Sequence, residues 1–238
     1  MATSVVGRGA VRDAVVLARV AAHREDVRVP SDPSSAVRRA LEDAVAQFLA
    51  TVRAIDPSRW DHVATDRWTV RQLFAHTVRG MAVLSDYLDA DAEPTGPELA
   101  DAADYFRTAL SMDRVHEGIA TRATDAAESA PDDLVAWADD VAAAMLTRVG
   151  ATDDDRVVVH FAGWIRFDAY LVTRVAELVL HTFDLQLACG LAVEAPERAL
   201  AVVNPFLLDL ADRADPRALA LALALTGRVA PVACNVLG

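Results

Sequence analysis

The sequence predicts a mainly α-helical fold. Alanine, leucine and valine dominate the 238 residues, whereas glycine and proline occur ten times each. Alanine and leucine have high helix propensity, and few helix-breaking residues interrupt them. In several segments the apolar residues also recur at steps of three and four, which is the period of a helix with one buried face. Composition and periodicity therefore both favour helix.

Two amphipathic helices are predicted in the first part of the chain. Apolar positions recur at helical steps over residues 35–55, until Asp56-Pro57 stops the pattern. A second helix begins after Thr69 and runs to Leu88. Thr69 and Gln72 form a capping-box pattern in front of this second apolar run, which is a signature of a helix N-terminus.

The middle of the chain contains two further helical segments. Gly96-Pro97-Glu98 is a helix-start signal, and an alanine-rich helix is expected from there towards Thr124, with a break near Ser111. Pro131-Asp132-Asp133 then opens a fourth segment, which ends at Gly150.

The last third of the chain contains the longest continuous helical pattern. Residues 156–159 are too few and too β-branched to indicate a helix, but residues 168–190 form an unbroken pattern that ends at a glycine. Residues 196–214 predict another helix, interrupted at Asn204-Pro205. Leucines that alternate with alanines over residues 219–225 suit a strand.

Charge and cysteine content restrict the classes of function. The net charge is −12, with no basic stripe, which argues against a nucleic-acid partner. No segment resembles a signal peptide or has the length and apolarity of a transmembrane helix, so no membrane association is expected. The two cysteines, Cys189 and Cys234, match no zinc or redox spacing and are interpreted as small buried hydrophobic residues. These features predict a cytoplasmic protein.

Four polar residues lie on one face of the helix predicted over residues 168–190. Arg174, Glu177, His181 and Asp184 are spaced three, four and three residues apart, and apolar residues surround them. Because the flanks of this polar stripe are apolar, the charges are expected to face a cavity. There they must either pair with one another or bind a metal.

Glu177 and His181 are one helical turn apart, so a carboxylate oxygen and an imidazole nitrogen can reach the same ion. This spacing is weak evidence by itself, because a Glu–His or Arg–Glu hydrogen-bonded pair in a helical core would look the same. From the residues of this helix alone, both interpretations stay open.

Two motifs resemble a known family. Trp68-Thr-Val-Arg-Gln-Leu-Phe-Ala-His76 resembles the start of the second helix of the DinB-like metalloprotein superfamily. The segment from Arg174 to Leu185 resembles the R-x-x-E-x-x-x-H-x-x-D-L signature of its mycothiol-dependent maleylpyruvate isomerase branch. The two motifs lie about a hundred residues apart in the expected order.

The resemblance implies a mainly α DinB-like four-helix bundle over residues 34–190. It is preceded by a partly disordered N-terminal extension, residues 1–33, and followed by a short, truncated α/β C-terminal extension, residues 191–238. The implied metal ligands are His76, Glu177 and His181, with an open coordination position of the kind that catalytic zinc needs. Zinc is preferred, although nickel or iron(II) would also suit two histidines and a carboxylate.

The resemblance also suggests roles for three residues near the implied metal. Asp184 could orient the His181 ring, or could instead pair with Arg174 or a backbone group. Arg174 could bind an anionic substrate, but a structural ion pair with Glu177 or Asp184 is favoured. Arg228 matches a family position near the cleft, or is only a turn residue.

The implied activity is that of a metal- and mycothiol-dependent isomerase or thiol S-transferase, acting through a metal-activated thiolate on a small electrophilic, carboxylated substrate. The partners are then a small-molecule substrate and a low-molecular-weight thiol, and the protein is a monomer or a homodimer. The alternatives are a metal-dependent hydrolase and a non-catalytic metal- or ligand-binding bundle.

The remaining candidates are interpreted as structural. His23, His62, His116 and His160 have no metal-spaced partner and are expected at the surface or in capping roles. Trp60 and Trp68 flank the loop that enters the second helix, and packing against the end of the bundle is favoured over substrate stacking.

Overall fold

A computed structural model describes residues 33–90, 92–113 and 115–213. Within these residues the fold is mainly helical, as predicted, with one small sheet of three strands. The helices are α2 (Pro33–Ala54), α3 (Val70–Asp89), α4 (Ala102–Leu110), α5 (Val115–Glu128), α6 (Leu134–Gly150), α7 (Phe167–Cys189) and α8 (Glu197–Asp212), with a short 3-10 helix, η1 (Pro57–Arg59). The strands are β1 (Glu98–Leu99), β2 (Val157–His160) and β3 (Gly163–Arg166).

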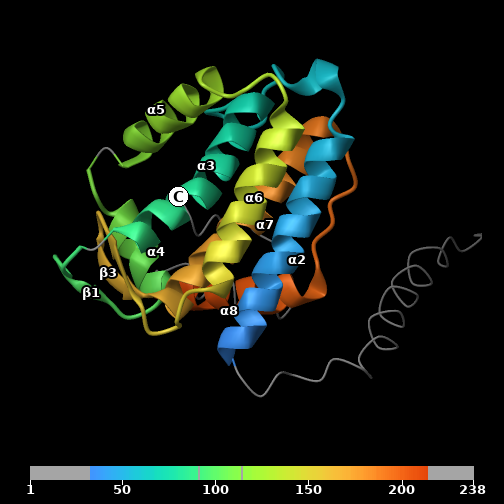
Figure 1. The fold of residues 1–238 in the computed structure, drawn as a ribbon. Coiled ribbons are helices and arrows are strands. Elements are labelled where there is room, and N and C mark those ends of the chain that lie inside the picture. The colour runs from blue at the N-terminus through green and yellow to red at the C-terminus, as the bar shows by residue number, and fades with distance from the viewer. Residues whose placement is uncertain (1–32, 91, 114, 214–238) are drawn as a thin grey trace, which may run out of the picture. The chain divides into compact units, whose positions relative to one another are not determined.

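Helices α2, α3, α6 and α7 form the bundle (Figure 1). Helix α3 packs against α5, α6 and α7, and α7 also packs against α8. Polar contacts attach α2 to its neighbours: Arg53 pairs with Asp139 of α6, and Gln186 of α7 donates to the Thr51 hydroxyl at 3.1 Å. The buried faces meet in one apolar core, where Phe48 stacks on Phe74 with ring centroids 6.2 Å apart. This packing places α3 beside α7 and so brings their polar residues together.

Helices α3 and α7 have the termini that the sequence predicts. The Thr69 side chain accepts from the Gln72 backbone at 3.3 Å, and the Gln72 side chain accepts from the Thr69 backbone at 3.0 Å, which completes the capping box. Helix α7 ends before Gly190, whose φ of 69° lies in the left-handed region. Both predictions are confirmed, and they set where α3 begins and where α7 ends.

The helix start predicted at Gly96-Pro97-Glu98 is wrong. Glu98 and Leu99 form β1, which pairs in parallel with Trp164 and Ile165 of β3. The next helix begins only after Asp101, whose side chain accepts from the Asp104 backbone and caps α4. Pairing with β3 stabilises this short segment as a strand, and this tertiary interaction outweighs the local helix-start signal. The predicted break near Ser111 is confirmed, since α4 ends at Leu110 and α5 begins at Val115.

The interruption predicted at Asn204-Pro205 is also wrong, because α8 continues through Pro205. Proline removes one backbone hydrogen bond, here that of the Ala201 carbonyl. Ala201, Asn204 and Pro205 all lie on the exposed face of α8, where water can satisfy the freed carbonyl. Val203 and Phe206 are buried on the opposite face and hold the helix in place.

Residues 156–159, which the sequence did not assign, contain most of β2. This strand pairs antiparallel with β3, so that His160 lies opposite Gly163 across a two-residue turn. Residues 1–32 of the predicted N-terminal extension (residues 1–33), the predicted strand over residues 219–225, Arg228 and Cys234 lie outside the described residues. None of the described helices is both long enough and apolar enough to span a membrane.

Gly163 is the position of the sheet where glycine is required. Its φ is 141°, and a Cβ there would lie 2.3 Å from the Pro97 carbonyl oxygen of the segment before β1. We expect Gly163→Ala to lower the free energy of unfolding by about 2 kcal/mol or more, because the strained backbone and the clash act together. Gly150→Ala, at a helix end with nothing within 4 Å of the added methyl, is the matched control and should be neutral or slightly stabilising. Urea denaturation of both variants measures the difference, and equal stability would contradict the account.

Candidate metal centre

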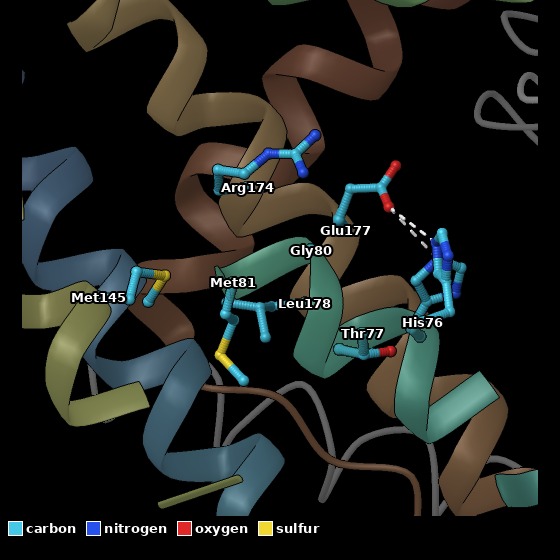
Figure 2. A pocket seen from close by; sticks show the side chains of 9 residues that line it. His76, Thr77, Gly80, Met81, Met145, Arg174, Glu177 and Leu178 are labelled. Atoms are coloured by element: carbon cyan, nitrogen blue, oxygen red, sulfur yellow. Dashed lines mark ion pairs between the residues drawn. The ribbon is translucent and has the colours of Figure 1, made fainter. Parts of the chain in front are cut away.

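Helices α3 and α7 bring three polar side chains together. His76 lies in the second turn of α3, and Glu177 and His181 lie one turn apart in the middle of α7. The Glu177 Oε2 atom is 3.7 Å from His76 Nε2 and 3.4 Å from His181 Nε2 (Figure 2). We call these three residues the triad. Their side chains are 17%, 29% and 19% exposed, so the triad is largely shielded but still open to a cavity.

Asp184 lies one turn beyond His181 on α7, and its Oδ2 atom is 3.3 Å from His181 Nδ1. When the imidazole is neutral, a proton on Nδ1 donates to this carboxylate and leaves the Nε2 lone pair directed at Glu177. The sequence left open whether Asp184 contacts His181 or Arg174, and the structure pairs it with His181. A carboxylate behind a histidine is a common way to orient a metal ligand.

The protonation states of the triad complement one another. Burial lowers the pKa of His76. Burial also acts to lower the pKa of His181, but hydrogen bonds to Asp184 and Glu177 outweigh it and raise this pKa to about 9. Burial opposes ionisation of Glu177, yet its hydrogen bonds to His181 and His76 hold the pKa well below the usual range. Near neutral pH the triad therefore contains a carboxylate, one imidazolium and one neutral imidazole.

The donor set and its spacing fit a divalent metal. One ligand atom from each residue can be chosen so that all three lie within 4.8 Å of one another. A tetrahedral ion with ligand bonds near 2.1 Å requires donor separations of about 3.4 Å, close to the two distances measured from Glu177. Within the described part of the chain no fourth histidine, cysteine or carboxylate joins the group. The residues present would thus leave one coordination position for another ligand.

Trp68 supports the triad from one side. Its ring stacks on His76 with centroids 4.7 Å apart and planes inclined by 28°, and meets His181 edge-on at 6.1 Å. Trp68 is therefore a packing residue, as predicted, and the residues that it packs against are the two histidines of the triad. Trp60 meets Phe74 edge-on at 5.2 Å and is a partly buried residue that packs against the core.

Arg174 does not form the ion pair that the sequence favoured. Within the described residues its guanidinium makes no salt bridge to Glu177 or Asp184. It lies over the Tyr170 ring at 4.9 Å, and its Nε donates to the Thr173 hydroxyl at 3.0 Å. The physical reason is that the histidines satisfy both carboxylates, which leaves the guanidinium directed towards the space above Glu177 (Figure 2).

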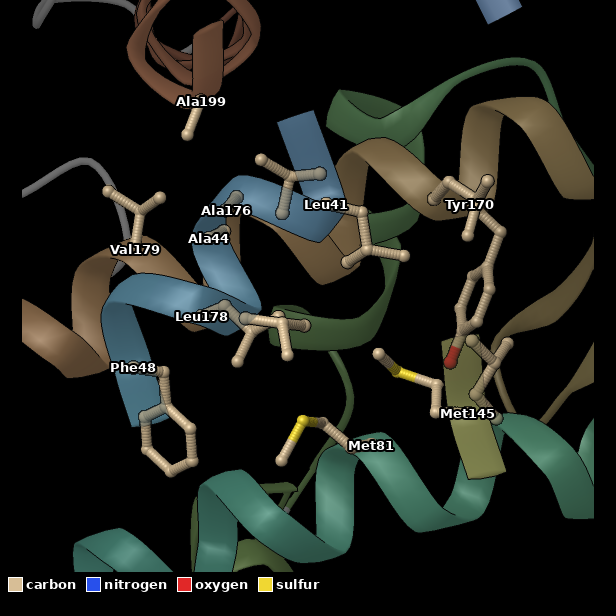
Figure 3. Packing of buried hydrophobic residues seen from close by; sticks show 14 of the residues in the cluster. Leu41, Ala44, Phe48, Met81, Met145, Tyr170, Ala176, Leu178, Val179 and Ala199 are labelled. Carbon is tan, nitrogen blue, oxygen red and sulfur yellow. The ribbon is translucent and has the colours of Figure 1, made fainter. Parts of the chain in front are cut away.

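Two cavities adjoin the triad. The smaller, of about 10 Å³, has room for roughly one water molecule. Its apolar wall is formed by Met81, Met145 and Leu178, which also belong to the bundle core (Figure 3). The larger, of about 310 Å³, shares four lining residues with the smaller one: His76, Gly80, Arg174 and Glu177. We call this larger space the substrate cavity, because it is large enough to accept a small organic molecule.

The expected surface or capping role of His160 is wrong. His160 is partly buried and lines the substrate cavity, where its Nε2 atom is 3.1 Å from the Tyr105 hydroxyl. Burial, with the charges of Arg174 and Arg122, lowers the pKa of His160 to about 3, so the ring is neutral at physiological pH. Sequence reasoning missed both residues because they come from α4 and from the end of β2, and no local spacing connects them.

The other candidates lie away from the triad or outside the description. His62 is exposed, beside Arg59, as the sequence predicted. Cys189 is only half-buried, and burial raises the pKa of its thiol, which does not favour a reactive thiolate. His23 and Arg228 lie outside the described residues.

Comparison with known proteins gives one result. The family model described as "Mycothiol maleylpyruvate isomerase N-terminal domain" matches residues 41–186, which include the whole triad. Neither the curated proteins nor the solved structures contain a match to the chain.

The first prediction for the triad concerns metal content. His76→Ala and His181→Ala should each reduce bound zinc to less than about a tenth of the wild-type content, because two remaining donors hold the ion poorly. His62→Ala removes an exposed histidine and should retain the full content. Elemental analysis of the purified variants after dialysis measures this, and full occupancy in both triad variants would exclude the site.

The second prediction concerns proton release. A metal requires a neutral His181, whose pKa of about 9 keeps it protonated at pH 7.5, whereas Glu177 is already ionised. Zinc binding at pH 7.5 should therefore release about one proton, and affinity should fall as the pH decreases below 9. Calorimetric titration in buffers of different ionisation enthalpy counts the protons. Asp184→Asn should release fewer, because it removes the hydrogen bond that raises this pKa, and zero release in the wild type would contradict the assignment.

Proposed function

Because the chain belongs to the mycothiol maleylpyruvate isomerase N-terminal domain family, we propose that it is a metal-dependent enzyme that uses mycothiol to isomerise a small electrophilic substrate or to transfer the thiol to it. The observation that carries this proposal is the convergence of two imidazole nitrogens on one Glu177 oxygen beside a cavity of about 310 Å³. A triad buried without such a cavity would suit a structural ion pair better.

His76, Glu177 and His181 would hold the metal, and zinc is the preferred ion. A divalent metal in this position would lower the pKa of a coordinated thiol, so that thiolate is available near neutral pH. Asp184 holds the His181 ring in place, and Trp68 covers one face of His76. Arg174 supplies a fixed positive charge at the junction of the two cavities.

The proposed chemistry balances without any redox partner. The sulfur of mycothiol adds to an electrophilic carbon conjugated to a carbonyl group, and the electron pair of the double bond moves onto the carbonyl oxygen. Rotation about the resulting single bond, followed by departure of the thiolate, gives the isomer. Protonation of the adduct instead gives the thiol-transfer product. The positive charge of Arg174 stabilises the negative charge that develops in both cases.

A reducing compartment is required to keep the thiol cosubstrate active, so we propose that the protein works in the cytoplasm.

Thermal unfolding tests the proposal. Zinc-loaded protein at a mycothiol concentration of 100 times the dissociation constant should unfold at a temperature about 5–10 °C higher than without the thiol. S-methylated mycothiol is the matched control, because it keeps the rest of the molecule but cannot supply a thiolate, and it should give little shift. The metal-depleted protein should respond to neither.

Turnover completes the test. Zinc-loaded protein with mycothiol should consume maleylpyruvate or a related conjugated keto acid, and the His181→Ala variant should not. Metal-dependent hydrolysis that is independent of thiol would favour the hydrolase alternative. Tight metal binding with neither turnover nor thiol-induced stabilisation would favour a non-catalytic binding bundle.

A further inference from the structure

The substrate cavity has a wall of aromatic rings. They come from α3, α4, α7 and the β2–β3 turn, and several meet edge to face: Tyr105 and Tyr170 at 5.7 Å, and Tyr87 and His160 at 5.1 Å. Phe161, at the tip of the turn, is 53% exposed and also lines the cavity. Such a wall favours a flat ligand, because aromatic faces and edges stack on planar groups.

Three arginines also line this cavity: Arg79 from α3, Arg122 from α5 and Arg174 from α7. Within residues 33–213 as described, none of the three forms an ion pair with a carboxylate, whereas surface arginines such as Arg198 do. Of the described residues that line the cavity, Glu177 is the only acid, and the triad histidines already contact it. The three arginines therefore give the cavity lining a net positive charge, although the net charge of the whole chain is −12.

The positive charge reaches across the cavity. Burial raises the pKa of Tyr87, and Arg174, Arg79 and Arg122 oppose that rise from three different helices. Arg79 and Arg174 are partly buried, whereas Arg122 is exposed on α5. A partly buried guanidinium group without a carboxylate partner has lost some hydration, and an anionic ligand can compensate for that loss. The cavity therefore favours binding of a negatively charged ligand.

The arginines are not equivalent. Arg174 also lines the small cavity at the triad, whereas Arg79 and Arg122 do not. Instead, Arg79 and Arg122 border a third cavity, of about 340 Å³, between α3, α5 and α6. The substrate cavity thus carries positive charge in two places. Arg174 lies beside the triad, whereas Arg79 and Arg122 lie away from it.

We propose that Arg79 and Arg122 bind the carboxylate of the substrate, while its planar, unsaturated body lies against the aromatic wall. This inference rests on the proposed function in one respect, namely that the ligand is the substrate of the triad. Anion recognition by the two arginines depends only on the cavity. The orientation directs the end of the ligand opposite the carboxylate towards Arg174 and Glu177.

Cinnamate is a suitable probe, because it is flat, conjugated and negatively charged. Calorimetric titration of the full-length, zinc-loaded protein should detect cinnamate binding, and cinnamamide, of the same shape but without charge, should bind at least about tenfold more weakly. Arg122→Gln and Arg79→Gln should each weaken cinnamate binding by about tenfold and leave cinnamamide binding unchanged. The flexible, saturated 3-cyclohexylpropanoate should bind more weakly than cinnamate if the aromatic wall contributes.

Arg53→Gln is the matched control, since Arg53 is an exposed arginine that pairs with Asp139 far from the cavity lining. It should bind cinnamate as the wild type does. Equal affinity in the wild type and both cavity variants would overturn the proposal, as would an equal loss in Arg53→Gln. Displacement of cinnamate by mycothiol in simple competition would also overturn it, because the cavity would then be the site of the thiol.

His76→Ala separates this inference from the proposed function. The substitution removes a triad residue and leaves Arg79 and Arg122 in place, so charge-dependent cinnamate binding should persist after metal and turnover are lost. If the wild-type protein binds cinnamate through these arginines but shows no thiol-dependent turnover, the proposed function fails and the anion site stands. If turnover is present but cinnamate binding is insensitive to both arginines, the proposed function stands and the anion site fails.

Discussion

The carboxylate of Glu177 is the group around which the rest of the site is arranged. It is largely buried, and a buried carboxylate must have compensating partners. One of its oxygens meets an imidazole from its own helix, His181, and another from α3, His76, at 3.4 and 3.7 Å. This shared contact connects the two helices through polar groups in an otherwise apolar interface. Trp68 and Asp184 then act on the histidines rather than on the carboxylate, one by stacking and the other by hydrogen bonding.

The sequence predicts those parts of the structure whose causes are local. Glu177, His181 and Asp184 share a helix, so periodicity alone places them on one face, and the capping box at Thr69 determines where α3 begins. The meeting of α3 with α7 joins segments about a hundred residues apart, and only the family resemblance indicated it. Strand β1 was mistaken for a helix start because its pairing partner lies in β3, far along the chain. Arg174 of the polar stripe on α7 was also expected to pair with Glu177 or Asp184, but it lies over Tyr170 instead.

The lining of the substrate cavity is even harder to predict from the sequence. Its lining comes from helices α3, α4, α5 and α7 and from the β2–β3 turn, and its members have no common spacing. Tyr105 and His160, for example, are 55 residues apart and meet only because β2 and α4 pack near α7. The small sheet is therefore part of the site, since the pairing of His160 with Gly163 holds the end of β2 and the turn that carries Phe161. Helical spacing could place Glu177, His181 and Asp184 on one face of α7, but it could not predict the cavity beside them.

We propose that the triad holds a metal ion with one coordination position open to a thiolate. Cobalt(II) can replace zinc as a spectroscopic reporter, because its visible absorption depends on coordination number and on the kind of ligand. The cobalt-substituted protein should show the spectrum of a low-coordinate ion, and addition of mycothiol should produce an intense new sulfur-to-cobalt charge-transfer band. S-methylated mycothiol should not produce this band. A cobalt spectrum that mycothiol leaves unchanged would contradict the account directly.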